Sequence, residues 1–397
     1  MRAALRDPTV KLEDDEQIKE LVERLDSEID GFIGSGSSGL RFRPTSGDIE
    51  GVLQALTPHL PGKADTILPV SKHGSGVISL QTLLLLFEFG RSRHKQGDNF
   101  ILAAEEPELH LHPGHHSRLV ARIRGTSDQS ITTTHSPEIA AYYSPHEVLI
   151  LRNDGGTMKA IPLIPSGEEI PDKNALMQLY TVHRAAICEA LMHHTVIIPE
   201  GKTEFQWFRS LLRLRVAVEG WENTCEGDEA VGILPTPDAQ VVLIYERFQP
   251  LVPQAVPLVD GDGAGDDYVK RLRKVKPAPP LILQLGSGHM LENVIAWLLS
   301  PSDFSEWTAV AAILTSMAAH TEAALVDQLK TNKVNWRLHE ELLGYIGTNE
   351  GAKRRLADFC DGLCELAVTG ATSKPCWSQD SRPSKGTTVA VWRWLPT

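Results

Sequence analysis

The feature that most constrains the fold is a series of short apolar runs that alternate with longer segments of helical spacing. Three of these runs, at 195–198, 256–259 and 281–285, have the length and side chains of buried strands. Apolar residues at helical spacing lie between them, over 204–214 and near 267–274. Strands that alternate with helices indicate a mostly parallel sheet with helices on its faces. The second half of the chain is therefore expected to be an α/β domain.

The first half of the chain shows a similar alternation. The expected elements, in chain order, are an amphipathic helix over 11–32, an apolar helix over 77–89, a strand over 99–104, a helix over 117–124 and strands over 130–134 and 147–152. Asn153-Asp-Gly-Gly156 is typical of a tight hairpin turn. The segment 164–173 is rich in Pro, Gly and acids, which predicts a domain boundary there.

The rest of the second half extends this pattern. We expect the apolar run at 241–245 to continue the series of strands. Beyond about residue 290 the chain has the apolar spacing of helices. A polar segment over 373–385 is expected to precede a final helix.

Length, charge and termini limit the class of protein. A chain of 397 residues favours two or three domains. No apolar run reaches the ~18 residues of a membrane span, and the first residues lack the apolar segment of a secretory signal, so we expect a cytoplasmic protein with no membrane partner. Five irregularly spaced cysteines indicate reduced thiols. The net charge of −12 argues against simple coating of nucleic acid, although it is compatible with a metal-dependent nuclease.

Gly201-Lys202-Thr203 follows the first of the apolar runs and raises the possibility of a phosphate-binding loop. Such a loop needs a glycine five residues before the Gly-Lys pair, so that backbone N–H groups can surround the phosphates. Val196 occupies that position. The segment is therefore expected to be a strand-to-helix turn, and its flanking acids become the candidates for chemistry.

Carboxylates follow two neighbouring strands of the predicted sheet. Glu200 comes directly after one strand and Glu204 lies on the first turn of the next helix, while Asp260 and Asp262 follow another strand. Because the carboxyl ends of parallel strands meet at one edge of a sheet, we expect these side chains to lie close together. Clustered carboxylates favour a hard cation, so the sequence predicts a Mg²⁺ or Mn²⁺ site with a phosphate substrate.

Three separated segments of the first half belong together by order and spacing. Ser75 and Gly76 lie in a Gly-Ser-Gly turn before a helix, Glu105 and Glu106 end an apolar strand, and His135 ends another. These segments resemble the signature motif, Walker B strand and switch histidine of ABC-type ATPases, in the form found in OLD (overcoming lysogenization defect) family proteins. The resemblance implies that Glu105 supports magnesium and Glu106 polarises the attacking water. It also implies that His135 senses the γ-phosphate, while Ser75 and Gly76 meet the nucleotide of a partner subunit.

The sequence departs from that family in one respect. It contains no G-x-x-x-x-G-K-[ST] motif, and the resemblance begins near the signature segment. We therefore expect no useful ATP hydrolysis by this chain alone, and ATP binding only with a phosphate loop from another chain. Either the coding sequence is truncated or a partner supplies the loop, so a homodimer or a partner ATPase chain is expected.

Four histidines, in His110-Leu-His-Pro-Gly-His-His116, leave two interpretations open. Histidines two residues apart can lie on one side of an extended chain and bind zinc. The same residues also lie where the ATPase resemblance expects the turn beyond the Walker B strand, and we favour this structural role.

The acids of the second half resemble a Toprim domain, as found in topoisomerases, primases and OLD-family nucleases. Glu-Gly-x-x-Glu and Asp-x-Asp carry the resemblance. It implies that Ser287 and Glu292 form a third block that holds a second metal ion, with catalysis by Glu200, Asp260 and Asp262. It also implies a late lysine near the scissile phosphate, for which Lys385 is the candidate and Lys374 the alternative.

The resulting fold class is α/β, with a partial ABC-ATPase-like sheet domain followed by a parallel-sheet Toprim domain and a C-terminal helical part. The predicted domains are 1–165, 190–300 and 301–397. The leading hypothesis is a two-metal DNA endonuclease linked to phage defence. The competing hypothesis is a catalytically inactive, truncated interaction protein that dimerises or binds another ATPase chain. A topoisomerase or primase is disfavoured, because neither a tyrosine-bearing cleavage domain nor a zinc module is evident.

Overall fold

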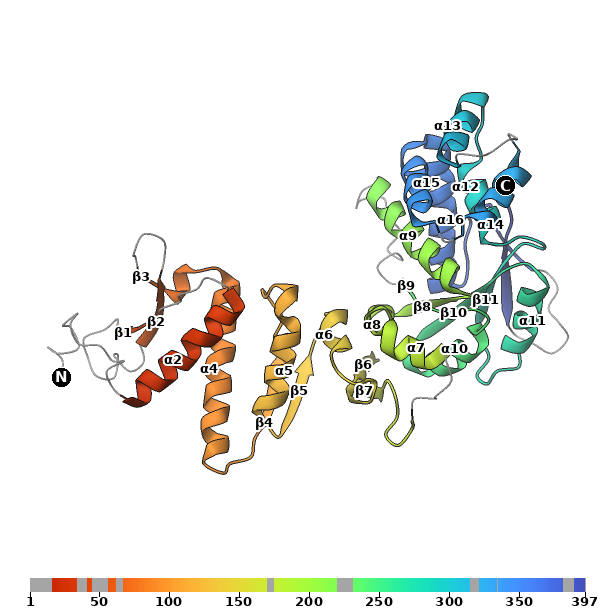
Figure 1. Ribbon diagram of the computed structural model, residues 1–397. Helices are drawn as coiled ribbons and strands as arrows, with labels where there is room; N and C mark the ends of the chain where they lie inside the picture. Colours follow the sequence, from red (N-terminus) through yellow and green to blue (C-terminus); the bar gives the residue numbers. More distant parts are fainter. Residues whose placement is uncertain are drawn as a thin grey trace. The chain divides into compact units, whose positions relative to one another are not determined.

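The chain forms two compact units, Met1–Tyr142 and Tyr143–Thr397. The computed structural model describes residues 16–33, 41–44, 56–61, 67–169, 175–219, 231–314, 321–333, 335–380 and 389–396 (Figure 1). Within the described ranges, no helix combines the length and the apolar character that crossing a membrane requires.

The first unit has a short parallel pair of strands and a separate antiparallel sheet. Its elements are α2 (Glu16–Ile33), β1 (Arg41–Pro44), β2 (Leu56–Pro61), β3 (Ile67–Pro69), α4 (Ser75–Lys95), β4 (Ile101–Glu105), α5 (His116–Thr126), β5 (Gln129–Thr133) and α6 (Pro137–Ala141). Strands β4 and β5 pair in parallel, and β1, β2 and β3 pair antiparallel in that order. The helix predicted over 11–32 is confirmed as α2 from Glu16 on, and residues 11–15 lie outside the described residues.

The core of the first unit lies between its helices and one face of β4. Leu25 of α2, Leu84 of α4 and Ile123 of α5 are buried in one cluster with Leu102 of β4. Burial alternates along β4, as a strand with only one covered face requires. Ile101 on the other face is 63% exposed.

The second unit is built around a six-stranded sheet. In chain order, its first elements are β6 (Leu149–Asp154), β7 (Thr157–Pro162), α7 (Ala175–Val182), α8 (Arg184–Leu191), β8 (Thr195–Pro199) and α9 (Lys202–Glu219). They are followed by β9 (Val231–Ile233), α10 (Val241–Phe248), β10 (Gln254–Val259), α11 (Gly263–Leu272), β11 (Leu281–Leu285) and α12 (Leu291–Leu299). The chain ends with α13 (Phe304–Leu314), α14 (Glu322–Thr331), α15 (Trp336–Thr348), α16 (Glu350–Thr369), β12 (Trp377–Gln379) and β13 (Ala390–Trp394).

The strand order is β12-β13-β11-β10-β8-β9, and every neighbouring pair is parallel except β12 and β13. Each face of the sheet carries its own core, because successive side chains of a strand point to opposite faces. Ile197 belongs to the cluster with α9, α12 and α16, whereas Val196 and Ile198 belong to the cluster with α7, α8 and α10. Figure 1 shows these two groups of helices on either side of the sheet. All residues of β8 and β11 are buried.

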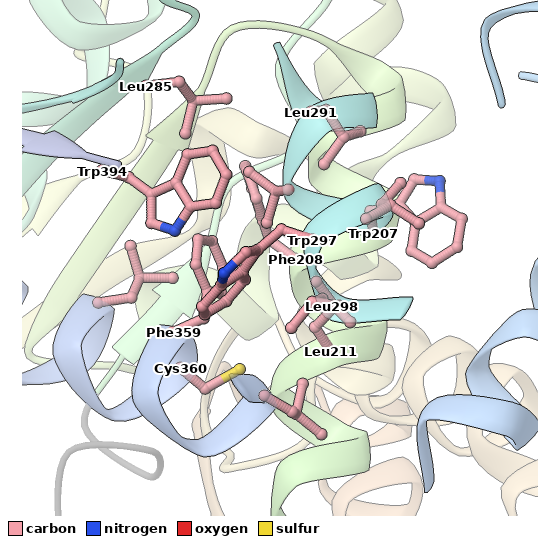
Figure 2. Packing of buried hydrophobic residues seen from close by; sticks show 14 of the residues in the cluster. Trp207, Phe208, Leu211, Leu285, Leu291, Trp297, Leu298, Phe359, Cys360 and Trp394 are labelled. Carbon is pink, nitrogen blue, oxygen red and sulfur yellow. The ribbon is translucent and has the colours of Figure 1, made fainter. Parts of the chain in front are cut away.

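Large aromatic side chains fill the core between the sheet and helices α9, α12 and α16 (Figure 2). Trp394 of β13 is fully buried, with its ring 5.6 Å from that of Trp297 and 6.3 Å from that of Phe359. Phe208 of α9 stacks on Phe359 at 6.0 Å. The last strand of the chain is therefore anchored in the centre of the second unit.

Two predictions of secondary structure are wrong. The run at 241–245 is helix α10, because its buried residues recur at helical spacing: Val241, Val242, Ile244, Tyr245 and Phe248. The expected final helix is strand β13, whose β-branched and aromatic residues complete the sheet beside β11. The hairpin turn at 153–156 is confirmed between β6 and β7, and this hairpin belongs to the second unit.

Candidate functional site

Four acidic side chains gather at the carboxyl edge of the sheet in the second unit. Glu200 follows β8, Asp260 follows β10, Glu204 lies on the first turn of α9 and Glu292 on the first turn of α12. The backbone N–H of Asp260 donates to Glu200 Oε2 at 3.0 Å. The negative charges of Glu204, Glu200 and Glu292 all act on Asp260. The structure therefore brings together acids that are up to 92 positions apart (Glu200 to Glu292).

Close backbone contacts fix the loops that carry these acids. Gly261 N–H donates to the His289 carbonyl and Gly288 N–H donates to the Gly261 carbonyl, both at 2.8 Å. A Cβ on Gly261 would lie 1.7 Å from the carbonyl oxygen of Gly286, so only glycine allows this approach. The glycine between the two aspartates thus locks the loop after β10 to the loop after β11.

Burial and mutual repulsion change the protonation of the cluster. Burial, followed by the charges of Glu204, Glu200 and Glu292, raises the pKa of Asp260 to about 8. Burial also raises the pKa of Glu200 and of Glu204. The charges that act on Asp260 are those of other acids, and the positive charge of Lys333 acts on Glu204 without outweighing its burial. The cluster can accept a cation once its protons leave.

Glu292 is the most deeply buried of these acids and has one cationic neighbour. Its residue is 3% exposed, and its Oε1 lies 2.7 Å from Lys333 Nζ. Its Oε2 is buried without a hydrogen-bond partner in the described part of the protein. Burial lowers the pKa of Lys333, but its pairing with Glu292 and the charges of Glu204 and Asp260 outweigh that effect, so the pKa is raised.

Asp262 and Ser287 lie in the same loops in different roles. Asp262 caps helix α11, because its Oδ1 accepts a hydrogen bond from Gly265 N–H at 2.8 Å. Its charge still raises the pKa of Asp260 and Glu200. Ser287 is exposed in the turn after β11. Asp262 therefore has a structural task in addition to any role in chemistry.

Neither of the two lysines predicted for catalysis, Lys385 and Lys374, is seen next to the acid cluster among the described residues. Lys385 lies outside the described residues. Lys374 Nζ is 3.0 Å from Asp361 Oδ2, and Asp361 also pairs with the buried Arg215 at 2.9 Å. Among the described residues, Lys333 contacts the acids; it precedes α15 in a segment with no recognisable motif, so no sequence pattern marks it as a site residue.

A divalent cation fits these residues by the chemistry of the donors. All the acids offer carboxylate oxygens, which Mg²⁺ and Mn²⁺ prefer, and Glu292 Oε2 is buried without a partner. As the side chains stand, no three His, Cys, Asp or Glu within the described ranges converge on a point that could hold a metal ion. Internal contacts account for this: Glu200 accepts the Asp260 N–H, Asp262 caps a helix and Glu292 pairs with Lys333.

Glu200 and Gly201 connect β8 to α9, which begins at Lys202, so Lys202 and Thr203 lie in the first turn of that helix. The exposed Lys202 contributes its backbone N–H, which donates to Asp238 Oδ1 at 3.1 Å. A Cβ on Gly201 would lie 2.9 Å from both Asp238 Oδ1 and Glu204 Oε2. A larger residue at this position would therefore displace the carboxylates of Asp238 and Glu204.

The predicted nucleotide residues of the first unit lie in neighbouring loops. His135 Nε2 is 3.4 Å from Glu106 Oε1, and Glu106 N–H donates to the Thr133 carbonyl at 3.0 Å. Glu106 adopts a φ of 40°, which is uncommon outside glycine. A Cβ on Gly76 would lie 2.4 Å from the carbonyl oxygen of His110, so the start of α4 approaches the turn after β4. Ser75 begins α4, and Glu105 ends β4.

These observations agree with the comparison to known families. Residues 7–140 match the family model of the AAA ATPase domain. The match ends just before the second unit begins, so the first unit contains an AAA-type ATPase-like region. A search of curated proteins finds no match. The predicted ATPase-like region is confirmed at this level, and the Toprim assignment of the second unit stays a prediction.

The second unit also contains a cavity of about 270 Å³, whose lining does not include the acids of the cluster. Its lining includes Glu189, His193, Arg209 and Arg213. Glu189 pairs with both arginines, at 3.2 Å in the case of Arg213. The lining thus carries one carboxylate that is shared by two guanidinium groups.

Proposed function

We propose that the second unit is a Mg²⁺- or Mn²⁺-dependent DNA endonuclease of the OLD/Toprim type. The observation that carries the proposal is the buried acid cluster at the carboxyl edge of a parallel sheet, with the pKa of Asp260 raised to about 8. In open α/β sheets this edge is where ligands and catalytic groups collect. Perturbed carboxyl groups in such a position are typical of functional sites.

In this proposal Glu200, Glu204, Asp260, Asp262, Ser287 and Glu292 would hold two metal ions. The ions would polarise the phosphodiester and generate the attacking hydroxide. The protein's own part is positional: the glycine contacts between the loops after β10 and β11 hold Asp260 beside Glu200 before substrate arrives. Asp260 holds a proton near neutral pH in the absence of a cation. DNA is the proposed substrate because the acids resemble those of Toprim nucleases.

The direct test is cleavage of supercoiled plasmid by the purified chain in Mn²⁺, Mg²⁺ or EDTA. Relaxed or linear DNA should form with either metal and not with EDTA. Glu292→Gln should reduce the rate, because it removes a buried carboxylate without changing its volume. Intact plasmid with every metal would reject the nuclease and favour the alternative, an inactive ATPase-like protein that dimerises or binds another ATPase chain.

The first unit supports a second role, in which nucleotide controls assembly. Its AAA match and the proximity of Glu106 and His135 support nucleotide contact, while the sequence has no Walker A motif. ATP would then bind only where another chain supplies a phosphate loop. Light scattering with and without an ATP analogue, on the chain alone and mixed with a candidate partner ATPase, tests this role. A strict monomer in every mixture would contradict it.

A further inference from the structure

We propose that Lys333 is a built-in counter-ion of the acid cluster, which neutralises Glu292 in the metal-free protein and is displaced from it by the divalent cation. The inference rests on the proposed metal site and adds a regulatory residue to it. It assigns Lys333 a positioning role toward Glu292 and no contact with the reacting atoms.

The first support is the environment of Glu292. A carboxylate that is 3% exposed is costly to ionise unless a positive charge lies beside it. Lys333 Nζ supplies that charge at 2.7 Å from Oε1. The second oxygen has no hydrogen-bond partner among the described residues, so Glu292 retains an unused donor site for a cation.

The second support is the balance of charge around the cluster. Of the side-chain charges that act on Glu204, those of Glu200 and Glu292 are negative and that of Lys333 is positive. The negative charges of Glu292, Glu204 and Asp260 in turn act on Lys333. The ammonium group of Lys333 therefore partly offsets the negative charge of several carboxylates, and a divalent cation would compete with it for the same carboxylates.

The third support is the way Lys333 is mounted. Asn332 caps the C-terminus of α14, and its backbone N–H and side-chain amide both donate to the Gln328 carbonyl, at 3.1 and 2.9 Å. The backbone next to Lys333 is thus held. The lysine side chain itself is 46% exposed, so its ammonium can leave Glu292 for solvent without crossing the core.

Calorimetric titration with Mn²⁺ tests the inference without relying on cleavage. Lys333→Met keeps the length of the side chain and removes the competing charge, so its Kd for Mn²⁺ should fall by roughly tenfold. Lys333→Arg keeps the charge and should bind Mn²⁺ much as the wild type does. Lys330→Met removes an exposed charge from the last turn of α14, three residues before Lys333, and should leave the Kd unchanged.

Thermal melts in EDTA give a second readout. Lys333→Met should lower the Tm by about 2–4 °C, because Glu292 loses its partner, and saturating Mn²⁺ should remove the difference. An unchanged or weaker affinity for Mn²⁺ in Lys333→Met would overturn the inference and leave the metal site standing. Absence of Mn²⁺ binding by the wild type would overturn the metal site, and the inference with it.

Discussion

The sheets of the two units differ in how completely they are covered, although both contain parallel strands that end in acids. In the second unit, β8 and β11 are buried throughout, with helices on both faces. In the first unit, β4 and β5 expose alternate residues, including Ile101 and Ile131. Parallel sheets are normally covered on both faces, whereas the described residues of the first unit leave one face of β4 and β5 exposed.

The acids at the ends of these strands also differ in how far other residues enclose them. Asp260 is surrounded by acids from the neighbouring elements of its own unit, and its pKa is raised to about 8. Glu106 meets His135, whose side chain is 88% exposed. The acid cluster of the second unit is thus enclosed by residues of that unit, whereas the pair of Glu106 and His135 in the first unit is more exposed.

The largest effect on stability is expected in the covered sheet. Trp394→Ala should lower the free energy of unfolding of the second unit by about 3–5 kcal/mol, because it leaves a cavity among Trp297 and Phe359. Ile131→Ala, in the exposed pair, should change it by less than about 0.5 kcal/mol. Urea unfolding followed by near-ultraviolet circular dichroism measures both, and equal losses would remove the distinction between the sheets.

The buried ion pair of the second unit should give the next largest effect. Asp361→Ala leaves the buried Arg215 without that partner and should cost about 3 kcal/mol. Lys374→Met should cost less, because Arg215 and Asp361 still pair. We expect Lys374→Met to retain plasmid cleavage, and loss of cleavage by this variant with an unchanged melt would restore Lys374 as a catalytic candidate.

The pH dependence of the metal-free protein should show the acid cluster directly. The folded pKa of Asp260, about 8, exceeds its unfolded value, so the native state binds more protons between about pH 4 and pH 8. Stability in EDTA should therefore fall as pH rises through that window, by at most about 1.4 kcal/mol per pH unit for this group. Glu200 and Glu204 contribute with the same sign.

Urea unfolding at pH 5, 6, 7 and 8 in EDTA measures this slope. Asp260→Asn should reduce it, since the amide does not titrate. Asp267→Asn, at an exposed position on α11, should leave it unchanged. The same slope in Asp260→Asn as in the wild type would show that Asp260 does not carry the effect.

The smallest effect is expected in the exposed pair of Glu106 and His135. His135→Ala should change the free energy of unfolding by less than about 0.5 kcal/mol, because the side chain is exposed and exposed ion pairs contribute little. A loss above 2 kcal/mol would mean that His135 has a structural role, and the description of this pair as exposed would fail. Thermal melts of the wild type and the variant measure the difference.

Sequence reasoning found most strands and the acids that follow them, because a buried parallel strand is a continuous apolar run and its end is marked by polar residues. It mistook α10 for a strand, since a five-residue apolar run fits either structure. It predicted a helix where the chain forms β13, because the pairing of β13 with β11 joins segments that are far apart in the sequence and leaves no local pattern. Lys333 lies far along the chain from the acid motifs and reaches Glu292 only through the packing of the C-terminal helices.

Cleavage of supercoiled plasmid in Mn²⁺ by Asp260→Ala and Lys202→Ala, with thermal melts of both, tests the central claim most directly. Asp260→Ala should lower the rate about a thousandfold or more and keep the fold, since removing one of several repelling carboxylates leaves stability unchanged or raises it. Lys202→Ala should cut at the wild-type rate, because the hydrogen bond that joins the start of α9 to Asp238 is made by the Lys202 backbone N–H. Normal cleavage by Asp260→Ala, or a greater loss in Lys202→Ala, would contradict the metal site at this edge of the sheet.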